Sequence, residues 1–172
     1  MLAVLLTGPP GAGKTSVLTA LHDALSDDDV AHAAIEVEML VWEHPGPSHE
    51  ERLGRVRAAC AMHRDAGHRL LLIAETLETD DDLAALLGAV GADEHAVVRL
   101  EARPATLAER IVAREPSGWS GLAQLVEHAQ ELATTMRALR GVDLVLSTEG
   151  ERAEDVAERI RAAFGPLAPA AG

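Results

Sequence analysis

A phosphate-binding loop near the start of the chain constrains the fold more than any other feature of the sequence. Residues 8–15 read GPPGAGKT, which is a full match to the pattern G-x-x-x-x-G-K-[ST]. An apolar run of strand length precedes the loop, and apolar residues at helical spacing follow it. In this strand–loop–helix context the pattern predicts a binding site for a nucleoside triphosphate, and a glycine-rich turn without a ligand is the alternative.

The residue types in the loop explain the predicted chemistry. Its glycines allow backbone angles that are closed to other residues, so that consecutive N–H groups can turn toward an anion. Lys14 would then reach the β- and γ-phosphates, and the Thr15 hydroxyl would hold Mg²⁺. The residues predicted to bind the nucleotide here are Gly8, Pro9, Pro10, Gly11, Ala12, Gly13, Lys14, Thr15 and Ser16.

The composition excludes several classes of protein and partner. The chain has 172 residues, enough for one domain with its own core, and no apolar run approaches the ~18 residues of a membrane span. Its formal net charge of −13 argues against a nucleic-acid partner, because binding a phosphate backbone requires a basic face. The opening run lacks the features of a signal peptide, and the single cysteine, Cys60, cannot form an internal disulfide. We therefore expect a cytoplasmic protein with neither a membrane nor a nucleic acid as partner.

Strand-like and helical segments alternate along the chain. Strands are predicted at residues 1–7, 30–37, 69–74, 96–100 and 142–146. Helices are predicted at residues 14–25, 48–66, 80–90, 104–114, 120–140 and 151–164. This alternation predicts a parallel sheet with right-handed crossovers and helices on both faces. We expect a single domain over residues 1–165 and a flexible tail at 166–172.

Acidic residues follow two of the predicted strands, at the edge where ligands of parallel sheets bind. Glu36 and Glu38 would share one face if the second strand continued through both. Either could accept the proton of an attacking hydroxyl or hold Mg²⁺ through water, and the alternative is a pair of solvated charges. Glu75 directly follows the third strand and could hold Mg²⁺ together with Thr15. The alternative for Glu75 is a helix-cap or surface role.

Two arginines precede a break that contains proline and glycine. Arg110 and Arg114 lie four residues apart on one helical face, where they could clamp phosphate oxygens, stabilise developing charge or stack on adenine. The break follows at once, and a short lid near residues 115–120 would close over the phosphates. The alternative is a solvated face on which the arginines pair with neighbouring glutamates.

A second loop offers side chains for an acceptor. Residues 42–48 read WEHPGPS and mark a loop before the helix at 48–66. Side chains in and after this loop could shape an acceptor pocket; they are Trp42, His44, His49, Arg52 and Arg55. The two histidines have no third ligand spaced with them, so surface positions are favoured over a metal pair. The helix could also offer a surface for a homodimer.

These segments together resemble the small P-loop kinases of the nucleoside and nucleotide kinase superfamily, which includes adenylate, shikimate, gluconate and adenylylsulfate kinases and chloramphenicol phosphotransferase. The resemblance rests on the phosphate loop, on Glu36-Val37-Glu38 in the place of an Asp-x-Asp element, on residues 108–118 as the region leading into the lid, and on residues 141–148 as the last strand. It implies a three-layer α/β/α P-loop NTPase fold with a five-stranded parallel sheet of order 2-3-1-4-5. It also implies that the paired arginines contact the donor nucleotide and that phosphate moves from ATP to a small acceptor.

The leading hypothesis is therefore an ATP- and Mg²⁺-dependent kinase that acts on a hydroxyl or phosphate of a small molecule. Lys14, Arg110 and Arg114 would stabilise the transferring phosphoryl group, and Glu36 or Glu38 would act as base. The alternative is an NTP hydrolase or a nucleotide-dependent switch acting on a protein partner, in which residues 42–48 would order on the γ-phosphate. A third hypothesis is an inactive nucleotide-binding module.

Overall fold

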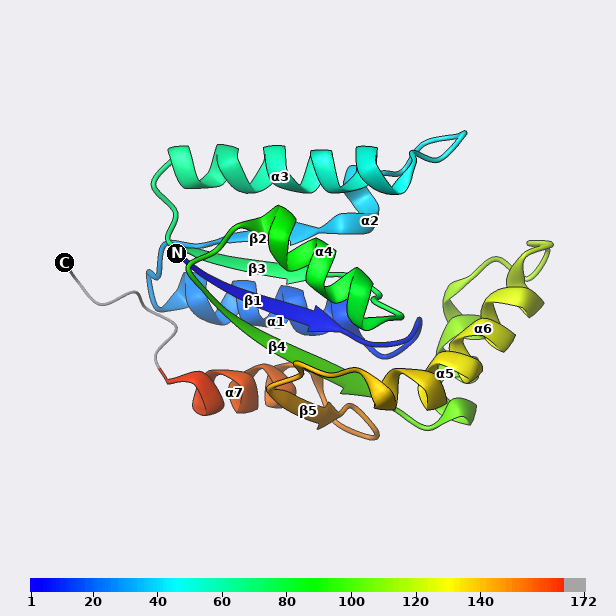
Figure 1. Ribbon diagram of the computed structural model, residues 1–172. Helices are drawn as coiled ribbons and strands as arrows, with labels where there is room; N and C mark the ends of the chain where they lie inside the picture. The colour runs from blue at the N-terminus through cyan, green and yellow to red at the C-terminus, as the bar shows by residue number, and fades with distance from the viewer. Residues whose placement is uncertain (166–172) are drawn as a thin grey trace.

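The computed structural model describes residues 1–165, which form a five-stranded parallel sheet with helices on both faces (Figure 1). The strands are β1 (Leu2–Thr7), β2 (Ala33–Glu36), β3 (Leu70–Ala74), β4 (Glu94–Glu101) and β5 (Leu144–Ser147). Their order across the sheet is β2-β3-β1-β4-β5, and every neighbouring pair is parallel. The predicted three-layer α/β/α fold and the strand order 2-3-1-4-5 are confirmed.

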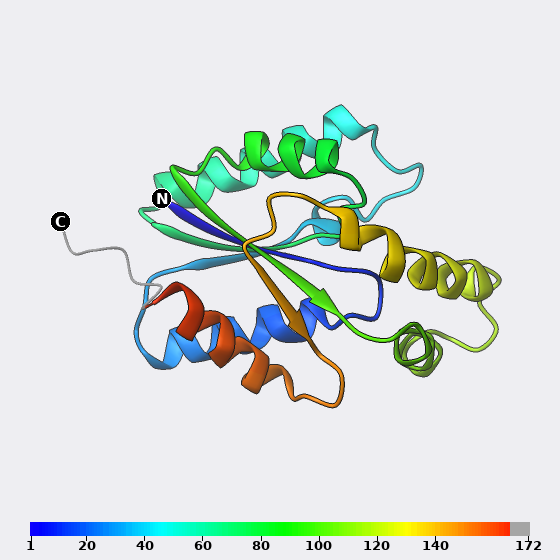
Figure 2. The same cartoon turned by 60° about the horizontal axis from the view of Figure 1, so that its bottom comes forward.

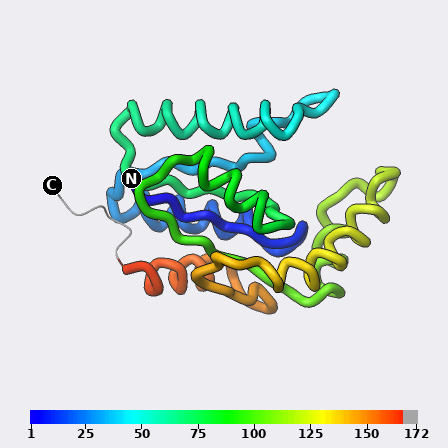
Figure 3. Tube along the Cα trace, in the orientation of Figure 1, coloured from blue at the N-terminus to red at the C-terminus, as the bar shows by residue number. Residues whose placement is uncertain are grey.

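The helices cover both faces of the sheet and extend past one edge. They are α1 (Lys14–Asp27), α2 (Val37–Leu40), α3 (His49–Asp65), α4 (Asp80–Val90), α5 (Pro104–Arg114), α6 (Leu122–Thr135) and α7 (Ala153–Phe164), with a 3₁₀ turn at Met136–Ala138. Figure 2 separates α1 and α7 on one face from α3 and α4 on the other. The α5–α6 pair and the loop after α2 both project past the carboxyl ends of the strands (Figure 3). None of the helices within residues 1–165 has both the length and the apolar character needed to cross a membrane.

Alternating side chains of β1 build a core on each face of the sheet. Val4 and Leu6 are buried in the cluster that includes α1 and α7, whereas Ala3 and Leu5 belong to the cluster that includes α3 and α4. Successive side chains of a strand point to opposite faces, so a continuous apolar run suits a strand covered on both sides. Because β1 lies between β3 and β4, the loop that follows it emerges at the middle of the sheet.

The parallel register brings the carboxyl ends of β1, β2 and β3 to the same level in the sheet. Leu6 of β1 pairs with Ala74 of β3, and Glu36 of β2 pairs with the same alanine. The backbone N–H of Glu75 continues this ladder by donating to the Leu6 carbonyl at 3.0 Å. The phosphate loop, Glu36 and Glu75 therefore share the carboxyl edge of the sheet, where ligands of such folds bind.

A capping box begins α3 and fixes where its first residues lie. The Glu51 N–H donates to Ser48 Oγ at 3.3 Å, and the Ser48 N–H donates to Glu51 Oε2 at 2.8 Å. Each residue thereby satisfies a backbone donor of the other, which is why the pair marks a helix start in the sequence. The cap places Arg52 in the first turn of α3.

Two segments differ from the sequence prediction, and a third lies outside the described residues. The predicted strand at 30–37 is shorter, because the chain turns into α2 after Glu36 and buries Val37 in that turn. The predicted helix at 120–140 ends at Thr135 and continues as a 3₁₀ turn, where Met136 is buried and its carbonyl accepts from Arg99 at 2.9 Å. The predicted tail at 166–172 lies outside the described residues.

Candidate active site

Glycines let the phosphate loop approach its neighbours closely. Gly8 and Gly11 have φ angles of +149° and +81°. A Cβ added at Gly11 would lie 2.9 Å from the carbonyl oxygen of Leu107 on α5, and one at Gly8 would collide with the carbonyl oxygen of Leu100 on β4. Only glycine can adopt these angles and fit where a Cβ has no room. The loop is therefore held in a shape that can surround an anion.

The Lys14 ammonium lies within this loop. Its Nζ donates to the carbonyl oxygens of Gly8 at 2.9 Å and Pro9 at 3.3 Å. Burial of the ammonium lowers the pKa of Lys14 from 10.5 to about 8, although nearby carboxylates, Glu38 foremost, oppose the shift. The oxygens of a phosphate bound in the loop would favour the charged form of Lys14, and the ammonium would in turn stabilise the bound anion. Lys14 is the only lysine in the chain.

A carboxylate contacts the threonine of the loop. Thr15 Oγ1 donates to Glu36 Oε1 at 2.5 Å, which joins the first turn of α1 to the end of β2. A hydroxyl and a carboxylate oxygen beside a phosphate cradle suit Mg²⁺, which takes only one or two protein oxygens and keeps waters and phosphates as its other ligands. Within residues 1–165, no group of three or more His, Cys, Asp or Glu side chains is placed to hold a metal ion.

Glu75 is buried beside an arginine. Its side chain is 3% exposed, and its carboxylate forms an ion pair with Arg52 of α3. Burial raises the pKa of Glu75, while Arg52 and the Thr76 N–H, which donates to Oε1 at 2.8 Å, favour the charged form. Of the predicted magnesium residues, the structure therefore brings Thr15 to Glu36, whereas Glu75 is bonded to Arg52.

Glu38 lines the cleft from the first turn of α2. Because β2 ends at Glu36, the two glutamates do not share the face of one strand, which was the condition for their predicted alignment. The Glu38 side chain is exposed, and no hydrogen bond or ion pair within residues 1–165 engages its carboxylate. Among the nearby carboxylates, Glu38 opposes the lowering of the Lys14 pKa most strongly, and both side chains line the same cleft.

Arg110 ties three segments together at the phosphate loop. Its Nη1 donates to the Gly11 carbonyl at 3.1 Å and to Thr148 Oγ1 at 2.9 Å, and its Nη2 donates to the Thr148 carbonyl at 2.7 Å. The Thr148 hydroxyl in turn donates to the Ala12 carbonyl at 3.1 Å. The guanidinium thus connects α5, the loop and the segment after β5. Arg114, four residues on, is exposed and pairs with its neighbour Glu115 at 2.7 Å.

One cleft of about 760 Å³ gathers most of the predicted residues. Its lining consists of Pro10, Gly11, Gly13, Lys14, Thr15, Ser16, Glu36, Glu38, Trp42, Arg110, Arg114, Glu115, Trp119 and Leu125. A hollow of about 270 Å³ lies beside the loop, between Arg110 and the start of α7. His49, Arg52 and Glu75 line a separate cavity of about 320 Å³, so only Trp42 of the predicted acceptor residues borders the main cleft.

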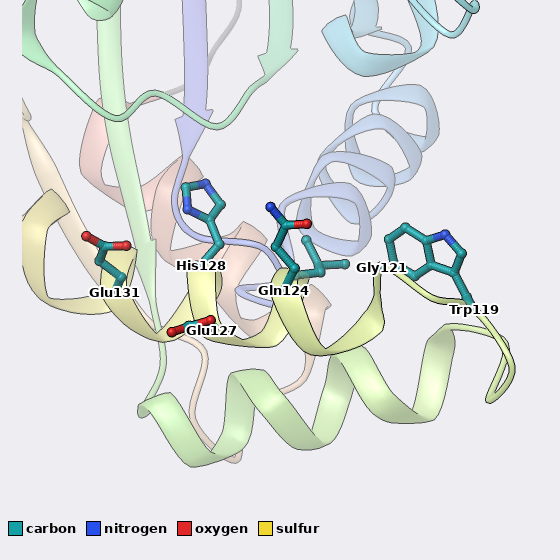
Figure 4. A pocket seen from close by; sticks show the side chains of 7 residues that line it. Trp119, Gly121, Gln124, Glu127, His128 and Glu131 are labelled. Atoms are coloured by element: carbon teal, nitrogen blue, oxygen red, sulfur yellow. The ribbon is translucent and has the colours of Figure 1, made fainter.

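A further hollow of about 510 Å³ runs along α6 (Figure 4). Trp119 and Leu125 line both this hollow and the main cleft, so the two adjoin. His128 also lines the hollow; its Nε2 lies 3.0 Å from Glu78 Oε1, and this pair connects α6 to the segment after β3. The α6 helix is therefore one wall of the region around the phosphate loop.

A family model described as an AAA domain matches residues 4–119, more than half of the chain. The chain belongs to this AAA domain family. The matched segment includes the phosphate loop, Glu36, Glu75 and both arginines of α5. A comparison with curated proteins finds no significant match to its sequence.

Solved structures share the fold of this AAA domain at low sequence identity. An unliganded sugar kinase from Janibacter sp. has a TM-score of 0.67 at 17% identity, over 98% of this chain and 99% of its own. The APS kinase from Mycobacterium tuberculosis, solved with AMPPNP and APS, has a TM-score of 0.66 at 19% identity, over 94% of this chain and 96% of its own. The tunicamycin resistance protein from Deinococcus radiodurans has a TM-score of 0.65 at 21% identity, over 97% of this chain and 98% of its own. The predicted resemblance to the small P-loop kinases is confirmed as a likeness of fold.

Two residues of the site carry only weak signals in the sequence. Thr148 is 4% exposed and joins Arg110 to the loop; its place directly after the fifth strand was the one available signal. Trp119 lies in the break between α5 and α6, and an aromatic residue within a polar loop was its only signal. Both become recognisable when α5, α6 and the end of β5 are placed around the loop.

Proposed function

We propose that this protein is an ATP- and Mg²⁺-dependent phosphotransferase that moves the γ-phosphoryl group to a small-molecule acceptor. The observation that carries the proposal is a shared cleft, in which the Lys14 ammonium, the Thr15–Glu36 pair and the Glu38 carboxylate all line one cavity. A phosphate cradle, oxygen ligands for magnesium and an accessible carboxylate are the parts that phosphoryl transfer requires. The likeness of fold to a sugar kinase and to an APS kinase supports the same function.

Donor binding would rest on the loop and on the start of α1. Backbone N–H groups at a helix N-terminus attract phosphate, and Lys14 would exchange its bonds to Gly8 and Pro9 for bonds to phosphate oxygens. Thr15 and Glu36 would hold Mg²⁺, which when bound supplies positive charge to the phosphates. We assign the nucleobase to the hollow of about 270 Å³ that Arg110 borders beside the loop.

Transfer also requires a base and a site without free water. Glu38 would accept the proton of the acceptor, because its carboxylate faces the cleft near Lys14 while Glu36 is engaged by Thr15. Arg114 would leave Glu115 and stabilise charge on the transferring group. The segment near residues 115–120, between α5 and α6, would act as the short lid that excludes water.

A panel of small alcohols and phosphorylated metabolites, each incubated with the protein, ATP and Mg²⁺, tests this function. We expect one or more acceptors to gain the mass of a phosphoryl group, and we expect the Lys14→Met variant to lose this product. ATP hydrolysis that no acceptor changes would favour the hydrolase or switch. Nucleotide binding without any turnover would favour the inactive module.

A further inference from the structure

The two tryptophans of the chain border the same cleft. Trp42 is 82% exposed and Trp119 is 45% exposed, and both line the cavity that contains the phosphate loop. Trp42 belongs to the loop after α2, and Trp119 belongs to the connection between α5 and α6. Both segments project past the strand ends (Figure 3). Since the chain has no tyrosine and one phenylalanine, two of its three Phe, Trp or Tyr side chains lie where a bound molecule would cover them.

The Trp119 ring has a defined position. A Cβ added at Gly121 would lie 2.5 Å from Cζ2 and 2.8 Å from Cε2 of Trp119, so the ring rests against the bare backbone of that glycine. The Trp119 N–H donates to the Pro116 carbonyl at 3.0 Å, and the Trp119 carbonyl accepts from the Leu122 N–H at 3.2 Å. A ring held on an ordered turn can stack on a ligand with little further loss of conformational freedom.

We call the part of the cleft lined by Glu38, Trp42 and Trp119 its acceptor side. This side favours a ligand without negative charge. The exposed arginine of the cleft lining, Arg114, already has an acidic partner, because it pairs with Glu115 at 2.7 Å. The Glu38 carboxylate has no such partner within residues 1–165. An acceptor that carries a carboxylate or a phosphate would have to displace an acid from an arginine and would be repelled by Glu38. An uncharged acceptor avoids both effects, and a cationic one is also attracted to tryptophan faces.

We propose that the acceptor is a hydroxylated ring compound without negative charge, which binds between Trp42 and Trp119. This inference rests on the proposed function and narrows its acceptor class. In the transfer, the acceptor hydroxyl oxygen bonds to the γ-phosphorus while the bond from that phosphorus to the β,γ-bridging oxygen breaks. The hydroxyl proton passes to Glu38, and ADP is released.

Intrinsic fluorescence can report on each ring separately. Trp42→Phe leaves Trp119 as the only tryptophan, and Trp119→Phe leaves only Trp42. Each variant is loaded with AMPPNP and Mg²⁺ and titrated with three sets of compounds. Each set shares one type of ring and contains an uncharged, an amine-bearing and an acidic member. The sets are methyl glucoside, glucosamine and glucuronate; inositol, an aminocyclitol and quinate; and a nucleoside, an aminonucleoside and a nucleoside monophosphate.

We expect an uncharged or amine-bearing member of at least one set to change the emission of both variants. Its affinity should exceed that of the acidic member by about tenfold or more, because like charges disfavour the acid. An acidic member that binds as tightly overturns the inference. So does a complete lack of response to every set.

Steady-state kinetics with the responding compound separate stacking from a structural role. Trp119→Leu should raise the acceptor KM by about tenfold, whereas Trp119→Phe should keep it near the wild-type value, because phenylalanine retains an aromatic face. Gly121→Ala should act like Trp119→Leu, since the added methyl displaces the ring. Met62→Ala, at a side chain 60% exposed on α3 and outside the lining of the cleft, is the matched control and should change nothing. A Trp119→Leu enzyme with an unchanged acceptor KM would contradict the proposal.

Product mass distinguishes a failure of this inference from a failure of the proposed function. Phosphate transfer to an anionic acceptor would keep the phosphotransferase and reject the acceptor class. Binding of an uncharged or cationic ring compound between the tryptophans without transfer would keep the binding site and reject the phosphotransferase.

Discussion

The two sides of the cleft that we propose for the donor and the acceptor are built in different ways. On the donor side, glycines fix the backbone of the loop, and Arg110 and Thr148 bond it to α5 and to the end of β5. On the acceptor side, Glu38 is exposed on the four-residue helix α2, and Trp42 is exposed on the loop that follows it. Backbone geometry suits a ligand that does not vary, such as a triphosphate, whereas exposed side chains on short elements suit a ligand that differs between proteins. We infer that a motif specifies the nucleotide donor, whereas individual side chains specify the acceptor.

Removing the ammonium of the donor side should have the largest effect. We expect Lys14→Met to lower kcat/KM by about 10³-fold, because the charge that faces the transferring phosphoryl group is lost. Thermal unfolding should keep its midpoint, since methionine replaces the aliphatic stem and burial already disfavours the charge, as the lowered pKa of about 8 shows. A kcat/KM within about tenfold of the wild-type value would show that the loop does not serve transfer.

Replacing the two glutamates tests where the donor side ends and the acceptor side begins. Glu38→Gln should lower kcat by about 10²-fold or more, because glutamine cannot accept the proton. Glu36→Gln should instead raise the Mg²⁺ concentration needed for half-maximal activity, because a ligand beside Thr15 is weakened. Activity is measured for both variants over a magnesium titration. The opposite pattern would assign the base to Glu36.

A pair of alanine substitutions compares the backbones of the two sides. Gly11→Ala should lower the free energy of unfolding by about 1–3 kcal/mol, because its φ is positive and the new Cβ meets the Leu107 carbonyl. Gly46→Ala, in the acceptor-side loop, should change it by less than about 0.5 kcal/mol, because no atom lies within 4 Å of the added Cβ. Urea unfolding measures both values, and equal effects would remove the contrast between a rigid and an open side.

The pH dependence of nucleotide affinity follows from the pKa of Lys14. Burial lowers this pKa to about 8, so the charged fraction in the free protein falls as the pH rises through 8. Phosphate binding favours the charged form, and the affinity should therefore be flat below about pH 8 and fall above it by at most about tenfold per unit. Titration of a fluorescent ATP analogue from neutral to alkaline pH measures this profile.

Chemical labelling gives an independent value for the same group. An amine-reactive reagent should acylate Lys14, the only lysine, with a rate that rises around pH 8, and nucleotide should protect it. Peptide mapping separates this product from the labelled N-terminus. A midpoint near the ordinary lysine pKa of 10.5 would mean that the ammonium is not buried as described.

Much of the fold and the donor side could be predicted because their signals are local. The apolar runs of β1 and β3 and the Ser48–Glu51 cap each lie within a few neighbouring residues. The contacts of the acids could not be predicted in this way. Whether Thr15 meets Glu36 or Glu75 depends on α3, which places Arg52 against Glu75 from a distant part of the sequence. The turn of the chain into α2 likewise depends on burial of Val37, which no local pattern showed.

If both sides of the cleft serve one reaction, each ATP consumed must yield one phosphorylated acceptor, and the stoichiometry of ATP use measures this coupling. ADP, free phosphate and phosphorylated acceptor are quantified together, with and without a ring compound that alters Trp42 and Trp119 emission. We predict that the compound stimulates ADP formation and that phosphorylated product accumulates in equal amount. ADP formation at an unchanged rate, with all of the phosphate released to water, would show that the two sides do not serve one reaction.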